Sequence, residues 1–176
     1  MELRFDKYEG IGNDFLVVEA ADPATLGSEQ AVRLCDRHFG VGGDGVLLVV
    51  PSSVAGARAR MIVLNADGSR PEMCGNGLRC VALHLVRAAG ETQAEFDVET
   101  DAGLRHCSVR LDGPSGWITT GLGQAVPGGP WSADWSQQRV DFHRVSMGNP
   151  HTITFREPVT SEQLDDLGPL VSSCFP

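Results

Sequence analysis

The sequence predicts an α+β protein in which β-strands, most of them antiparallel, surround a central helix. Two observations indicate this class. Short apolar or alternating runs, bounded by Gly, Asp and Pro, recur along the 176 residues in the manner of β-strands. Few segments have helical periodicity, and the strongest of them is apolar on several faces, so we expect the strands to enclose it.

The expected elements are mostly strands. A short helix is expected over 28–38, with Ser28 as its N-cap, and a longer one over 78–89, where apolar residues repeat at helical spacing. Another short helix should begin near Ser161. Strands are expected at 14–20, 45–50, 59–64, 94–100, 104–111, 117–120, 140–147 and 151–155.

The stretch 121–136 is rich in Gly and Pro and has no periodicity, which is typical of a connection between domains. We therefore expect an N-terminal domain over 1–123, an interdomain crossing over 124–136 and the start of a second domain over 137–176. The residues after the crossing are too few to close an independent β-rich domain. The second domain is expected to be incomplete.

Composition and charge exclude several classes of protein. A formal charge of -9 and the lack of any basic run argue against a nucleic-acid partner. No apolar stretch is long enough to span a membrane and the first residues do not resemble a secretion signal, so we expect a cytoplasmic protein without a membrane partner. The five cysteines have neither CxxC spacing nor paired histidines, so they predict no metal site and no disulfide framework.

The densest group of unusual residues, 65–77, lies between an expected strand and the enclosed helix. Cys74 sits there near the start of the helix, where backbone N–H groups carry partial positive charge that stabilises a thiolate. Gly75 and Gly77 leave room for a ligand, and the N–H groups that open a helix can bind a carboxylate. A base beside a bound carboxylate could remove the proton from the adjacent carbon. Taken alone, a single cysteine here is more often a buried structural residue, as we expect for Cys80.

A wider pattern adds to this reading. Five blocks occur in order: GIGNDF at 10–15, CDRHFGVGGDG at 35–45, NADGS at 65–69, MCGNGLRC at 73–80 and MGNPH at 147–151. Together they strongly resemble the diaminopimelate epimerases, and the resemblance covers essentially the whole chain. It implies two lobes, each an antiparallel β-barrel around a central helix. It also implies an isomerase that interconverts LL- and meso-diaminopimelate, for lysine and peptidoglycan precursor synthesis, without pyridoxal phosphate or another cofactor.

The resemblance also assigns roles to individual residues. Cys74 matches one of two catalytic thiols, and His151 matches a histidine that assists catalysis. Gly75 and Asn76 match positions whose backbone N–H groups bind the α-carboxylate of an amino-acid substrate. The positions that contact the distal end of the substrate are matched by Asn13, Asn65 and Asn149. Without the family pattern, asparagines beside Gly or Pro are typical of turns.

One departure from the family concerns the second catalytic thiol. The second catalytic block, an Ala-Cys-Gly run that opens the second central helix, is not found in these residues, and Cys174 lacks its neighbours. We therefore expect this chain to be an N-terminal portion that does not epimerise alone. A homodimer or a complementing C-terminal portion is left open as partner. Two other functions stay open: a related cofactor-independent amino-acid racemase, and a non-catalytic remnant that binds a ligand.

Overall fold

The computed structural model describes residues 3–147, 150–156 and 160–173. The chain divides into two compact units, residues 1–123 and 124–176. The first unit carries the helices α1 (Ser28–Cys35) and α2 (Gly75–Ala88) and a short 3-10 helix, η1 (Pro23–Thr25). Its strands are β1 (Asp6–Gly10), β2 (Asn13–Glu19), β3 (Gly45–Val50), β4 (Ala57–Asn65), β5 (Gln93–Thr100), β6 (Gly103–Asp112) and β7 (Ser115–Thr120).

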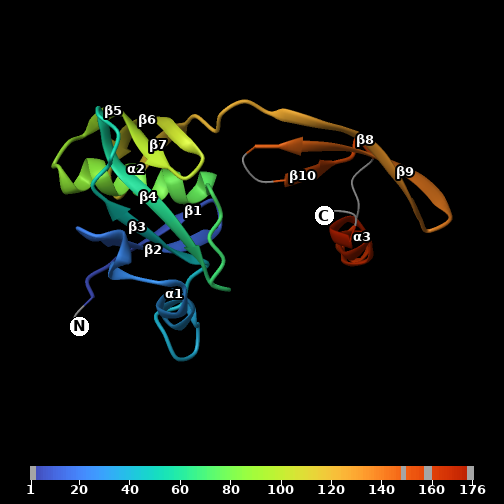
Figure 1. Cartoon of the computed structure of the whole chain (residues 1–176), viewed down its shortest axis with the longest axis horizontal. Helices are drawn as coiled ribbons and strands as arrows, with labels where there is room; N and C mark the ends of the chain where they lie inside the picture. Colours follow the sequence, from blue (N-terminus) through green and yellow to red (C-terminus); the bar gives the residue numbers. More distant parts are fainter. Residues whose placement is uncertain (1–2, 148–149, 157–159, 174–176) are drawn as a thin grey trace. The chain divides into compact units, whose positions relative to one another are not determined.

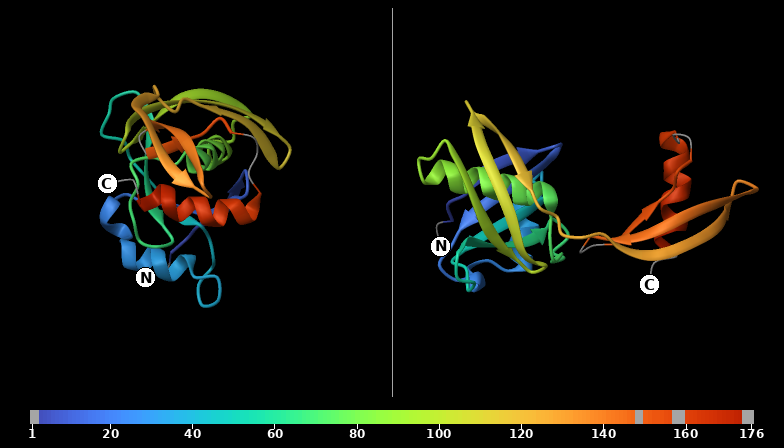
Figure 2. Two further views of the ribbon diagram at one scale, coloured as in Figure 1. Left: turned by 90° about the vertical axis from the view of Figure 1, so that its right-hand side faces the viewer. Right: turned by 90° about the horizontal axis from the view of Figure 1, so that it is seen from above.

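These seven strands form one sheet in the order of the chain, from β1 to β7. The sheet curls around α2, which contacts every one of the seven strands (Figures 1 and 2). The predicted α+β class and the predicted helix enclosed by strands are therefore confirmed. Within the described residues, β1 and β7 are the edges of the sheet, which forms a curled half-barrel around α2.

Two of the six strand pairs in this sheet are parallel, β2 with β3 and β4 with β5, and the other four are antiparallel. Parallel neighbours need a crossover connection, and here α1 makes the first crossover and α2 the second. Crossovers are almost always right-handed. Because β4 and β5 run opposite to β2 and β3, right-handed crossovers place the two helices on opposite faces of the sheet. Accordingly, α1 packs on β3 and β4 outside the curl.

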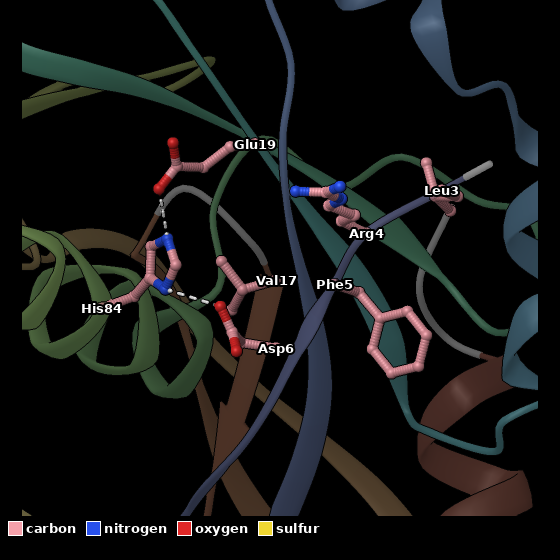
Figure 3. Close-up of a pocket in the computed structure, with 7 residues that line it drawn as sticks. All are labelled: Leu3, Arg4, Phe5, Asp6, Val17, Glu19 and His84. Atoms are coloured by element: carbon pink, nitrogen blue, oxygen red, sulfur yellow. Dashed lines mark hydrogen bonds and ion pairs between the residues drawn. The ribbon is translucent and has the colours of Figure 1, made fainter.

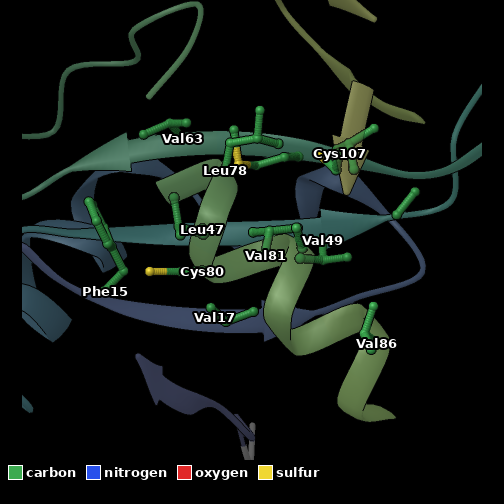
Figure 4. Close-up of a cluster of buried hydrophobic side chains, with 14 of the residues drawn as sticks. Phe15, Val17, Leu47, Val49, Val63, Leu78, Cys80, Val81, Val86 and Cys107 are labelled. Carbon is green, nitrogen blue, oxygen red and sulfur yellow. The ribbon is translucent and has the colours of Figure 1, made fainter. Parts of the chain in front are cut away.

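Both faces of the central strands are buried as a result. In β3, Leu47 and Val49 face the core around α2, whereas Val46 and Leu48 face the core around α1. This explains why all six residues of β3 are apolar or Gly and buried. Figure 4 shows the inner core, in which side chains of α2 lie against those of β2, β3 and β4; the buried residues from α2 are Leu78, Cys80, Val81, Ala82 and Val86.

The bounds of α1 differ from the prediction. Its N-cap residue is Gly27 and not Ser28. The helix ends at Cys35 and not near residue 38, because the side chain of Asp36 accepts hydrogen bonds from the backbone N–H groups of residues 38 and 39, at 2.7 and 2.8 Å. Those two N–H groups are thereby withdrawn from the helical pattern.

Strand β1 was not expected from the sequence, because DKYEG has one aromatic residue among polar ones. It pairs with β2 through a two-residue turn, Ile11–Gly12, in which both φ angles are positive, 53° and 87°. Such turns suit the twist of a hairpin but favour Asn or Gly at the first position. Because Ile11 is β-branched and not Asn or Gly, sequence patterns do not predict this turn.

The second unit contains β8 (Val126–Trp135), β9 (Gln138–Ser146), β10 (Pro150–Ile153) and α3 (Ser161–Ser173). The strands form an antiparallel sheet in the order β10-β9-β8. Most of the expected crossing, 124–136, is therefore strand β8, which accommodates its Pro and Gly residues with an irregular register between Pro127 and Gly129. Val140, Phe142 and Leu167 form its core. In the described part of the chain, no helix is both long and apolar enough to cross a membrane.

Candidate active site

The topology of the first unit brings distant residues to one end of the sheet. Because β2 and β3 are parallel and β3 and β4 are antiparallel, the starts of β2 and β3 lie beside the end of β4. Phe15, Gly45 and Asn65 are consecutive partners across these three strands. Asn13, Asp44 and Asn65 therefore share this end. Helix α2 follows β4 and makes the crossover to β5, so it also begins here.

Cys74 is the N-cap residue of α2, with extended backbone angles (φ -133°, ψ 112°). Its Sγ atom accepts a hydrogen bond from the backbone N–H of Gly77 at 3.3 Å. The residue is half-buried and packs against the border of the inner core. The helix begins at Gly75, three residues before the predicted start, so the sulfur lies directly at the helix N-terminus.

The two glycines after Cys74 differ in their surroundings. A Cβ atom on Gly77 would lie 2.8 Å from Cδ2 of Leu47 in β3, so this glycine lets the helix start pack closely on the sheet. A Cβ atom on Gly75 would lie 3.2 Å from Cδ2 of Leu122. The N–H groups of Gly75 and Asn76 belong to the first helical turn, where helix geometry provides no intrahelical acceptor and the partial charge is positive. They can bind an anion.

Two of the predicted binding asparagines are joined through their side chains. Asn76 Nδ2 donates to Asn13 Oδ1 at 2.9 Å, and Asn13 Nδ2 donates to Asp44 Oδ2 at 2.9 Å. At the other side, Arg79 Nη1 donates to Asn76 Oδ1 at 2.6 Å. Asp44 and Arg79 were not predicted as site residues. An acidic residue between glycines, directly before a wholly apolar strand, is the signal that could have pointed to Asp44.

Asn65 is held separately, within its own loop. Its Nδ2 donates to Ser69 Oγ at 2.8 Å, and Ser69 Oγ donates in turn to Asp67 Oδ1 at 2.5 Å. The backbone N–H of Asn65 also donates to the carbonyl of Ser69. These bonds close the loop after β4 and fix the side chain of Asn65.

Ion pairs hold the end of the sheet together. Asp14 pairs with Arg37 at 2.6 Å and with Lys7 at 2.9 Å, and Arg37 also pairs with Asp44 at 2.9 Å. Hydrogen bonds from Arg37, then from Lys7, hold the pKa of Asp14 well below its usual range. The pKa of Asp44 is lowered chiefly by the hydrogen bond from Asn13. Both carboxyl groups are therefore charged near neutral pH.

The other predicted site residues are not in this unit. His151 lies on β10 in the second unit and is exposed. Asn149 falls outside the described residues. No group of three or more His, Cys, Asp or Glu side chains within the described ranges is placed to hold a metal ion.

The remaining described cysteines are buried, with exposed fractions of 4% for Cys35, 2% for Cys80 and 0% for Cys107. Burial raises the pKa of all three thiols, to about 12 for Cys80 and Cys107. Cys80 lies in the inner core, as the sequence predicts. Cys174 falls outside the described residues. Cys74 therefore differs from the other described cysteines in being partly accessible.

A separate polar cluster surrounds His84, ten residues after Cys74 along α2, or about 15 Å by helical rise. His84 Nε2 lies 2.6 Å from Glu19 Oε1, and its Nδ1 lies 3.3 Å from the hydroxyl of Tyr8 and 3.6 Å from Asp6 Oδ2. His84, Glu19 and Asp6 border a pocket of about 640 Å³ (Figure 3). The partners satisfy a nearly buried imidazole, so a structural role accounts for the cluster.

Residues 5–127 match the family model of diaminopimelate epimerase. The chain belongs to the diaminopimelate epimerase family. It is 37% identical to the diaminopimelate epimerase of Synechocystis sp. over 97% of this chain and 66% of that protein. It is 40% identical to the enzyme of Synechococcus elongatus, over 97% of this chain and 65% of that protein. The rice protein named as the chloroplastic enzyme is 38% identical, over 95% of this chain and 53% of that protein.

The chain thus spans just under two thirds of the length of the cyanobacterial epimerases that it matches. Solved structures share the epimerase-family fold at low identity. A protein described as a predicted epimerase from Pseudomonas aeruginosa has a TM-score of 0.72 at 16% identity, over 98% of this chain and 67% of that one. A hydroxyproline epimerase from Agrobacterium vitis has a TM-score of 0.66 at 17% identity, over 92% and 52%.

Proposed function

We propose that this chain is the N-terminal portion of a diaminopimelate epimerase, in which Cys74 is one of two thiols that exchange a proton with the substrate α-carbon. The observation that carries the proposal is the position of Cys74 Sγ, half-buried at the N-cap of α2 and facing the N–H of Gly77 at 3.3 Å. The partial positive charge of a helix N-terminus favours the thiolate. The thiolate is the form that can accept a proton.

The proposed reaction balances with two thiols and no cofactor. The α-carboxylate binds the backbone N–H groups of Gly75 and Asn76, which stabilise the negative charge that develops next to it. The Cys74 thiolate takes the α-proton, so a C–H bond breaks, an S–H bond forms and the electron pair stays on the substrate. A second thiol then gives its proton to the opposite face of the carbon and becomes the thiolate. Inversion results.

The second thiol is not identified in this chain, because the family's second cysteine block is not matched in its 176 residues. We therefore expect no epimerisation by the chain alone. In the complete site, His151 would assist a thiol through a hydrogen bond. The distal amino-acid end of the substrate would contact Asn13, Asn65 and Asn149, whose amides offer both donors and an acceptor to a zwitterion. Lysine and peptidoglycan precursor synthesis follows as the proposed role. The cytoplasmic location stays a prediction, and a homodimer or a complementing C-terminal portion stays open as partner.

Ligand protection of Cys74 tests the proposed site directly. The chain is treated with iodoacetamide with and without LL-diaminopimelate, and labelling of Cys74 is followed by peptide mass spectrometry. We expect diaminopimelate to slow labelling, because its carboxylate occupies the helix start beside the sulfur. Pimelate, which lacks both amino groups, is the matched control and should protect less. Equal labelling with and without saturating diaminopimelate contradicts the proposal.

A second measurement tests the expectation for the isolated chain. In deuterium oxide, the chain and LL-diaminopimelate should give no meso product, since one thiol cannot serve both faces; any deuterium at the α-carbon should enter with the LL configuration kept. Rapid turnover that survives in Cys74→Ser would show that this sulfur is not the base. Protection of Cys74 by proline or 4-hydroxyproline, and not by diaminopimelate, would assign the site to a related racemase.

A further inference from the structure

Four side chains at the site form a continuous hydrogen-bonded relay: Asp44, Asn13, Asn76 and Arg79. Asp44 Oδ2 accepts from Asn13, Asn13 Oδ1 accepts from Asn76, and Asn76 Oδ1 accepts from Arg79, at 2.9, 2.9 and 2.6 Å. The relay runs from the loop before β3, past the start of β2, to the first two turns of α2. It joins residues 31 and 63 positions apart in the sequence.

The chemistry at its two ends fixes the direction of the relay. A carboxylate can only accept hydrogen bonds and a guanidinium can only donate them, whereas an amide can be turned either way. Turning Asn13 around would set its carbonyl against the carboxylate of Asp44. Turning Asn76 around would set its amino group against Arg79. The two asparagines therefore have one favourable orientation each.

Asp44 also connects the surrounding backbone. Its N–H donates to the carbonyl of Asp14 at 2.8 Å, and its carbonyl accepts from the N–H of Ala66 at 3.1 Å. Its carboxylate accepts from the N–H of Asp14 at 3.1 Å and from Arg37 Nη2 at 2.9 Å. One residue thus ties together the start of β2, the start of β3 and the loop that follows Asn65.

We propose that Asp44 is a positioning residue that orients the amides of Asn13 and Asn76 for ligand binding, an inference that rests on the function proposed above. Since one N–H of Asn13 is used by Asp44 and its carbonyl by Asn76, its second N–H is the group offered to a ligand. This N–H donor suits a carboxylate oxygen of the diamino acid. The same relay anchors the side chain of Asn76, whose backbone N–H lies in the proposed carboxylate site.

Side-chain amide exchange, measured by NMR on ¹⁵N-labelled protein, tests the relay without any ligand. In Asp44→Asn, the new amide must turn its NH₂ group either toward Arg37 or toward Asn13, and both neighbours are donors. We expect the side-chain NH₂ protons of Asn13 and Asn76 to exchange about tenfold faster, the factor expected for one lost charge-assisted hydrogen bond. Asp14→Asn removes a carboxylate that also pairs with Arg37 but is outside the relay, so exchange should stay as in the wild type.

A double variant separates positioning from a general effect on stability. Arg37→Met removes the competing donor, so in Asp44→Asn/Arg37→Met the amide oxygen of residue 44 can turn to Asn13. Slow exchange should return, although no carboxylate is present. Thermal unfolding of each variant checks that the fold is kept. Unchanged exchange in Asp44→Asn, or the lack of any rescue in the double variant, overturns the positioning role.

Binding of diaminopimelate to the same variants, followed by calorimetry, links the relay to the ligand. We expect the Kd to rise about tenfold in Asp44→Asn and to recover in the double variant, while Asp14→Asn binds as the wild type does. A wild-type chain that binds no diaminopimelate contradicts the proposed function, and the exchange data alone then decide whether Asp44 positions the two amides. Faster exchange with an unchanged Kd overturns the role in ligand binding.

Discussion

The four described cysteines should differ sharply in their reaction with iodoacetamide in the native protein. Cys74 is half-buried at a helix N-terminus, whereas Cys35, Cys80 and Cys107 are 4%, 2% and 0% exposed. We expect Cys74 to be alkylated first by a wide margin. This selectivity is what a thiol that works on a substrate requires, and it can be measured without knowing the substrate.

The size of the difference follows from the ionisation of the buried thiols. The nucleophile is the thiolate, and burial raises the pKa of Cys80 and Cys107 to about 12. At pH 8 such a thiol is ionised in about one molecule in 10,000, whereas a thiol with the ordinary pKa of 9.0 is ionised in about a tenth of the molecules. Native Cys80 and Cys107 should therefore react about three orders of magnitude more slowly than they do in the unfolded chain.

Trypsin makes the assay simple, because it cleaves after Arg79 and so separates Cys74 from Cys80. Native protein is pulsed with iodoacetamide, quenched and digested, and each cysteine peptide is quantified by mass spectrometry. The same pulse in guanidinium chloride gives the reference rate for each thiol. Labelling of Cys80 or Cys107 as fast as that of Cys74, in protein that is still folded, would refute the reasoning. Cys74→Ser should lose the fast reaction alone.

The same raised pKa values predict a loss of stability in alkali. An ordinary cysteine has a pKa of 9.0, so the unfolded chain releases these thiol protons above about pH 9, while the folded chain keeps them until about pH 12. The unfolded state then binds fewer protons, and the free energy of unfolding falls as pH rises through this window. Below pH 9 these thiols should have no effect. The urea midpoint of Cys107→Ala should fall less steeply with pH than that of the wild type.

Two substitutions near the site should change stability in opposite directions. Gly45→Ala would place a Cβ atom 2.9 Å from the backbone carbonyl oxygen of Leu64, so we expect a loss of about 2 kcal/mol by urea unfolding, and a stability equal to the wild type would show that β3 and β4 separate easily. Ile11→Asn should raise the free energy of unfolding by about 1 kcal/mol, because Ile11 has a φ of 53° and is 76% exposed; a destabilised variant would mean that its side chain has contacts that matter.

The sequence predicted most elements because hydrophobic periodicity is a local property. The runs now seen as β2 to β7, β9 and β10 alternate or are wholly apolar, and the periodicity of α2 is unbroken from Leu78 onward. β1 and β8 were missed for local reasons too. The first is polar with a β-branched residue in its turn, and the second contains Pro127 and two adjacent glycines, which usually interrupt strands.

Within the site, the sequence could place Cys74 but not its hydrogen bonds. Its position before a glycine-rich helix start is readable from a few neighbouring residues. The bonds from Asn13 to Asp44 and from Asn76 to Asn13 cross 31 and 63 residues, so they depend on how the strands pair. Asp44 lies within the CDRHFGVGGDG block at 35–45. Nothing in its neighbouring residues distinguishes a carboxylate that belongs to the relay from one in an ordinary turn.

The relative direction of neighbouring strands decides whether the site forms. Had β2 and β3 been antiparallel, as most pairs in this sheet are, the start of β2 with Asn13 would lie at the opposite end from the start of β3 with Asp44. The observed parallel register, Phe15 with Gly45, brings them to one end, and it exists because α1 crosses over between the two strands. The second crossover, through α2, brings Cys74 and Asn76 to that same end. The proposed site therefore depends on the two parallel pairs, which are the part of the topology that hydrophobic patterns leave undetermined.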